Sequence, residues 1–129
     1  MNISEAAKQV GVTAVTLRYY EREGLVPEIR RKNGGVRDYQ PEDIKWIDFI
    51  VCMRSAGLSV ESLAQYTRLY NQGTSTIDER KKLLQEERKK LADKRQEIID
   101  TLNKLDGKIQ DYEDGKYGIQ DTSLTSCNK

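Results

Sequence analysis

The pattern of apolar positions is most regular in the second half of the chain. A series of apolar residues seven positions apart, called here the heptad series, consists of Ile77, Leu84, Leu91, Ile98, Leu105 and Tyr112. Apolar residues kept at that interval over five heptads predict one long amphipathic helix that pairs with another helix. Because one helix cannot bury such a stripe alone, we expect a homodimer that presents the N-terminal half twice at a fixed separation.

The second row of core positions, three or four residues from the heptad series, favours antiparallel pairing. Its first half is cationic and its second half apolar: Lys81, Arg88, Arg95, Leu102 and Ile109. Two parallel copies would bring the cations together, whereas antiparallel copies place the charged half against the apolar half. The expected dimer interface is therefore the heptad series with Leu102 and Ile109. We expect a coiled-coil helix over 76–112, starting at a Thr76-x-x-Glu79 capping box, and a flexible, polar tail over 113–129.

Shorter elements are predicted in the first half. Ser4 can cap a helix to about residue 10, and Thr13 can cap another over 14–23, which together predict a helix-turn-helix. Asn33-Gly34 between short alternating segments predicts a β-hairpin. Two further helices are expected over 41–56 and 60–71. The predicted fold class is mainly α, with a winged helix-turn-helix domain over 1–73, a small hairpin wing and the long coiled-coil helix.

The second helix of this helix-turn-helix carries the candidate DNA contacts. Its hydroxyl, aromatic and cationic side chains are Thr13, Thr16, Arg18, Tyr19, Tyr20 and Arg22. In this motif the second helix lies in the major groove, where arginine binds guanine edges or phosphates and hydroxyl groups bind backbone oxygens. Arg18 and Tyr19 are the strongest candidates, with Thr16 assisting. Tyr20 lies on the same helix face as Leu17, so packing and DNA contact are both open for it.

The predicted hairpin is basic. It contains Arg30, Arg31, Lys32 and Arg37. Alone, such a run is typical of a solvated strand edge. Next to a helix-turn-helix it favours a wing that binds phosphates, and we expect Arg37 and Tyr39 to make those contacts.

Composition narrows the functional classes. The chain has no histidine, the commonest general base and metal ligand, so we expect neither an enzyme nor a metal site, and no cofactor. It has no apolar run long enough to span a membrane and no signal peptide, so a cytoplasmic location is expected. The two cysteines, Cys52 and Cys127, are too few for a disulfide framework. Cys52 can be a small buried apolar residue or a reactive sensor thiol, and the residues alone leave both open.

Several segments resemble the MerR family of transcription regulators. The stretch from Ile3 to Leu25 resembles the family's N-terminal signature, with Thr-Leu-Arg-Tyr-Tyr-Glu-Arg-Glu-Gly-Leu over 16–25 as its most specific part. The segment 33–39 resembles the wing and 43–59 the second helix pair, so the resemblance extends over about 2–112. It implies a winged helix-turn-helix, an antiparallel coiled-coil dimer and binding to a promoter spacer too long for RNA polymerase. The dimer bends and untwists that spacer, which activates by deforming DNA.

The resemblance also favours one branch of the family. Metal-sensing members carry a cysteine near the start of the long helix and a pair in a following loop, and this long helix has none. Multidrug-sensing members carry an added ligand domain, for which we expect no room here. The chain is similar to the NmlR/AdhR-like branch, which senses aldehydes and other electrophiles through one cysteine in the helix after the wing. Phe49-Ile-Val-Cys-Met-Arg54 matches at Cys52, which favours the sensor interpretation. A metal-responsive regulator and a coiled-coil adaptor that binds protein remain the alternatives.

Overall fold

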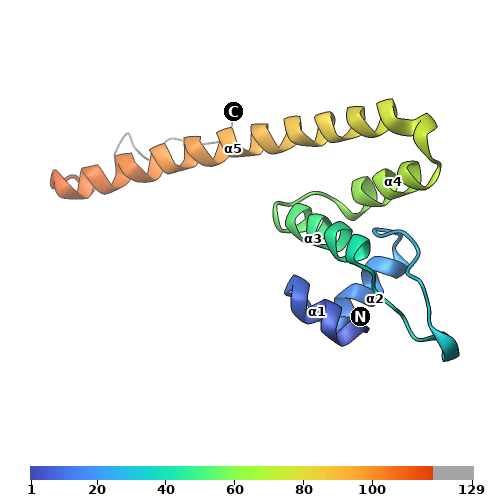
Figure 1. The fold of residues 1–129 in the computed structure, drawn as a ribbon. Helices are drawn as coiled ribbons and strands as arrows, with labels where there is room; N and C mark the ends of the chain where they lie inside the picture. Colours follow the sequence, from blue (N-terminus) through green and yellow to red (C-terminus); the bar gives the residue numbers. More distant parts are fainter. Residues whose placement is uncertain (118–129) are drawn as a thin grey trace. The chain divides into compact units, whose positions relative to one another are not determined.

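The computed structural model describes residues 1–117 of the chain, so Cys127 and the end of the tail lie outside the described residues. In order, the elements are α1 (Ile3–Val10), α2 (Ala14–Arg22), the 3₁₀ turn η1 (Asn33–Gly35), α3 (Pro41–Ser55), α4 (Val60–Asn71), the 3₁₀ turn η2 (Thr74–Thr76) and α5 (Ile77–Glu113). The α helices are labelled in Figure 1. The predicted mainly α fold with a long C-terminal helix is confirmed. The chain divides into a compact head unit, Met1–Glu87, and a second unit that begins at Arg88, within α5.

Local capping explains where most of these helices begin. The Thr13 hydroxyl accepts a hydrogen bond from the Thr16 amide at the start of α2, and Ser59 caps α4 in the same way, each at 3.1 Å. At α1 the expectation was wrong, because Asn2 and not Ser4 is the N-cap. Asn2 and Glu5 form a reciprocal capping box there, each accepting from the other's amide at 2.9 Å.

The core of the head unit lies between α1, α2, α3 and α4. Its largest fully buried apolar side chains are Leu17, Leu25, Ile47, Ile50 and Leu63. The carbonyl of Leu25, just after α2, accepts hydrogen bonds from Trp46 Nε1 of α3 at 3.0 Å and from the Thr67 hydroxyl of α4 at 2.9 Å. The backbone that follows α2 is therefore fixed to both later helices of the head.

The predicted hairpin is shorter than expected. The β pairing found in the described residues is a single antiparallel bridge between Arg31 and Arg37. Between them the chain turns through η1, where Gly34 and Gly35 have φ values of 82° and 81° that favour glycine. Positive φ at these two residues forms the tight turn that connects the two bridged arginines. The wing of this protein is thus a basic loop, residues 30–38, closed by one bridge.

The start of α5 is held to α4 within the head unit. The Thr76 hydroxyl lies within hydrogen-bonding distance of the carbonyls of Leu69 and Gly73, so it is used by the preceding turn and not in the expected box with Glu79. Arg80 donates to the Thr76 hydroxyl and the Gly73 carbonyl, both at 3.1 Å. Its guanidinium also lies 5.4 Å from the centre of the Tyr70 ring. These contacts make the joint between α4 and α5 a packed structure.

α5 has 37 residues, which corresponds to about 55 Å. Much of the predicted apolar stripe is open to solvent: Ile77, Leu91, Ile98, Leu102, Leu105, Ile109 and Tyr112 are between 37% and 57% exposed, and Leu84 is partly buried. Among residues 1–117, no helix combines the length and the apolar character needed to cross a membrane.

Candidate DNA-binding surface

α2 presents two different faces. Leu17 and Tyr20 are buried in the head core, whereas Arg18 and Arg22 are exposed and Tyr19 is partly exposed. The guanidinium of Arg22 lies 5.4 Å from the centre of the Tyr19 ring, which restricts both side chains. Arg18, Tyr19 and Arg22 therefore form a cationic and aromatic outer face.

Thr13 and Thr16, both predicted to contact DNA, form hydrogen bonds at the start of α2. Thr13 caps α2, and its hydroxyl oxygen lies 3.0 Å from that of Thr16. Each hydroxyl is thus already engaged at the helix start. A contact of either with DNA remains a prediction, but both residues help to set where α2 begins.

Glu21 joins α2 to the wing and was missed by sequence reasoning. Its carboxylate accepts a hydrogen bond from Arg37 Nε and lies 3.6 Å from a guanidinium nitrogen of Arg31. The hydrogen bond to Glu21 raises the pKa of Arg37, so that guanidinium stays charged. The signal in the sequence was the one carboxylate of α2, which stands next to Arg22. The pairing of Glu21 with Arg37 could not be inferred from it, because only the fold brings residues 21 and 37 together.

Tyr39 is placed differently from the expectation that it holds a phosphate. Its side chain is only 3% exposed, and its hydroxyl is buried without a hydrogen-bond partner in the structure. Burial raises the pKa of its phenol. The ring packs in the head core at the end of the wing, so in this conformation Tyr39 positions the wing. Tyr20, for which packing was one of two open interpretations, is likewise 7% exposed and belongs to the core.

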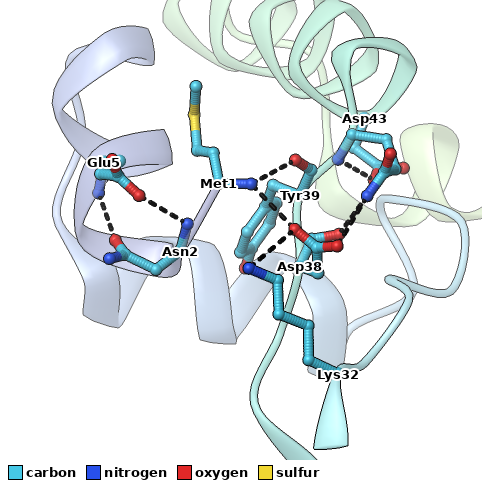
Figure 2. A network of polar contacts seen from close by, with 8 residues as sticks. Met1, Asn2, Glu5, Lys32, Asp38, Tyr39 and Asp43 are labelled. Atoms are coloured by element: carbon cyan, nitrogen blue, oxygen red, sulfur yellow. Dashed lines mark hydrogen bonds and ion pairs between the residues drawn. The ribbon is translucent and has the colours of Figure 1, made fainter.

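The C-terminal end of the wing is tied to the chain's first residue (Figure 2). The amino group of Met1 donates to Asp38 Oδ1 at 2.9 Å and to the Tyr39 carbonyl at 3.0 Å. The Tyr39 amide in turn donates to the Met1 carbonyl at 2.7 Å. Asp38 also lies 3.7 Å from Lys32 Nζ and accepts from Gln40 Nε2 at 3.0 Å. The hydrogen bond from the Met1 ammonium lowers the pKa of Asp38, with Lys32 adding to the effect.

Cys52, the predicted sensor, lies on α3 and is exposed. Lys45 and Asp48, seven and four residues earlier on the same side of α3, are exposed charges of opposite sign. The neighbouring Phe49 ring faces inward, 6.0 Å from the Tyr66 ring of α4. Within residues 1–117 no group of three or more Cys, Asp or Glu side chains is arranged to hold a metal ion.

Comparison with known proteins gives matches over most of the chain. The family model described as MerR HTH family regulatory protein matches residues 1–69, and a second, described as MerR, DNA binding, matches residues 44–108. The HTH-type transcriptional regulator AdhR of Bacillus subtilis is 60% identical over 84 residues, which span 65% of this chain and 60% of that relative's length.

Two solved structures are similar over nearly nine-tenths of the chain. One, a MerR family transcriptional regulator of Listeria monocytogenes, has a TM-score of 0.85 and 43% identity, covering 88% of this chain and 86% of the other. The second, HiNmlR, is a MerR family regulator lacking the sensor domain and was solved bound to promoter DNA. It has a TM-score of 0.79 and 29% identity, covering 89% of this chain and 91% of the other.

Proposed function

Because this chain belongs to the MerR family of DNA-binding transcription regulators, within its NmlR/AdhR-like branch, we propose that it is a homodimer that distorts promoter DNA when reactive electrophiles modify Cys52. The proposal has three parts, which concern the DNA contact, the dimer and the sensor. Each rests on a different region of the molecule.

The DNA contact is assigned to α2 and the wing. Arg18 and Tyr19 on the outer face of α2 bind in the major groove, and Thr13 and Thr16 at the start of the helix assist at the DNA backbone. Arg37, held by Glu21, binds phosphate from the wing. The net charge of the whole chain is only +1, so DNA affinity depends on this local concentration of cations. The solved complex of HiNmlR with promoter DNA supports promoter DNA as the partner.

The dimer is assigned to α5. Its exposed apolar stripe has a heptad period, and the cations Lys81, Arg88 and Arg95 lie at the opposite end from Leu102 and Ile109. An antiparallel second copy covers the stripe and separates the cations. The resulting pair of α2 helices bends and untwists the promoter spacer, so that RNA polymerase engages both promoter elements.

The sensor is assigned to Cys52, and the observation that carries it is the exposure of this thiol on α3. With an α,β-unsaturated aldehyde, the thiolate sulfur forms a bond to the β-carbon, the carbon–carbon π pair moves to the α-carbon, and that carbon takes a proton from water. No oxidant is needed. The added group changes the packing of α3 against α4, and the joint at Thr76 and Arg80 passes the change to the start of α5.

The test is footprinting on the DNA upstream of the chain's own gene, with and without acrolein. We expect the wild type to change its footprint and transcript level on treatment, and Cys52→Ala to bind the DNA but not respond. Cys127→Ala is the matched control, because it removes the chain's other thiol and should leave the response unchanged. A Cys52→Ala variant that responded fully would refute the sensor role without touching the DNA-binding role.

A further inference from the structure

The outer face of α2 contains an apolar side chain that the proposed DNA contacts leave unexplained. Val15 is 71% exposed, which makes it the most exposed large apolar side chain among residues 1–117. It makes no contribution to the core, which α2 supplies through Leu17 and Tyr20. A single exposed valine is ordinary on a protein surface, so its meaning depends on where it lies.

Val15 lies on the face that meets DNA in the proposed function. It is the second residue of α2, and Arg18 and Arg22 follow it by three and seven residues, which places all three on one side of the helix. In a helix-turn-helix, the N-terminal residues of the second helix contact base edges in the major groove. Val15 thus occupies the part of α2 that is best placed to approach the bases.

The first turn of α2 offers little else for base recognition. The hydroxyls of Thr13 and Thr16 are engaged with each other and with the helix cap. The exposed group between them is therefore the pair of Val15 methyls. In the major groove, the feature that an apolar side chain contacts favourably is the 5-methyl group of thymine, because the other edges are hydrogen-bond donors and acceptors.

We propose that Val15 is a specificity-determining residue that packs against one thymine 5-methyl group in each half-site of the operator. The inference rests on the proposed DNA contact through α2 and adds the base that it selects. Sites bound by this chain then contain a thymine at one fixed position per half-site, on the strand whose methyl group faces the start of α2.

The test exploits deoxyuridine, which lacks only the methyl group of thymidine. A duplex is selected from a random-sequence pool by the full-length chain, and each thymidine is then replaced singly by deoxyuridine. At fixed salt, we expect one replacement per half-site to weaken wild-type binding by about three- to fivefold, the loss of one methyl contact. The affinities of Val15→Ala for the thymidine and deoxyuridine duplexes should differ by no more than about twofold. In a double-mutant cycle, this loss of the methyl effect indicates a direct contact between Val15 and the thymine methyl group.

Val36→Ala is the matched control, because Val36 is an exposed valine on the wing and not on α2. This variant should keep the full deoxyuridine effect at the position assigned to Val15. A Val15→Ala variant with the same deoxyuridine profile as the wild type overturns the inference while leaving DNA binding intact. Failure of the wild type to bind any duplex in a salt-dependent way overturns the proposed function itself.

Discussion

In the head unit, four helices of 8 to 15 residues enclose a common apolar core, whereas α5, with 37 residues, leaves a row of leucines and isoleucines exposed. The short helices have local caps and tertiary hydrogen bonds, such as those to the Leu25 carbonyl. Most of the α5 stripe is exposed, and Leu84 is its partly buried member. Packing of an apolar face supplies most helix stability in water, and for α5 the proposed second copy would supply that packing.

The largest expected effect comes from charging the stripe. Ile98→Glu combined with Leu105→Glu places four carboxylates in the proposed antiparallel interface, and we expect analytical ultracentrifugation to find monomers at micromolar concentration. Because two linked DNA-binding units gain affinity by avidity, operator affinity should fall by about 100-fold or more. The control is Asn103→Glu, which should remain dimeric. Asn103 is exposed and lies between Ile98 and Leu105 in the sequence, but it does not belong to the apolar stripe. A double variant that still sediments as the wild-type species would exclude this stripe as the interface.

The second-largest expected effect concerns the head unit, whose apolar core is formed by residues of one chain. Leu17→Ala removes a side chain only 2% exposed, and we expect the free energy of unfolding of the head to fall by about 2–5 kcal/mol. Val15→Ala on the same helix should change it by about 0.5 kcal/mol or less, because Val15 is exposed. The single tryptophan, Trp46, packs against the rings of Tyr66 and Tyr70 and provides the fluorescence signal for urea unfolding. Equal losses in both variants would contradict the assignment of faces on α2.

The same contrast explains what the sequence could predict. The start of α2 at Thr13, the start of α3 at Pro41 and the stripe of α5 follow from caps and periodicity, which are local properties. The bonds of Glu21 to Arg37 and of Met1 to Asp38 join residues 16 and 37 positions apart, and no periodic pattern indicates such pairs. The burial of Tyr39 was missed for the same reason, since an aromatic residue beside a basic loop suits a core and a phosphate contact equally well.

The smallest expected effect concerns the wing anchor at Met1 and Asp38. Because the Met1 ammonium lowers the pKa of Asp38 in the folded chain, the anchor is fully present above the ordinary aspartate pKa of 3.8 and is lost as the pH falls through the lower folded value. Asp38 is near solvent, so we expect a local loosening of the wing and no global unfolding from this group. The Tyr39 amide donates to the Met1 carbonyl, so its NMR resonance reports on the anchor and is to be recorded from pH 6 downward.

The Asp38→Asn variant should abolish the titration and shift the resonance already at pH 6. The control is Asp48→Asn, at an exposed aspartate of α3, which should leave both the titration and the resonance unchanged. A Tyr39 resonance that titrates identically in Asp38→Asn would show that another group holds the wing.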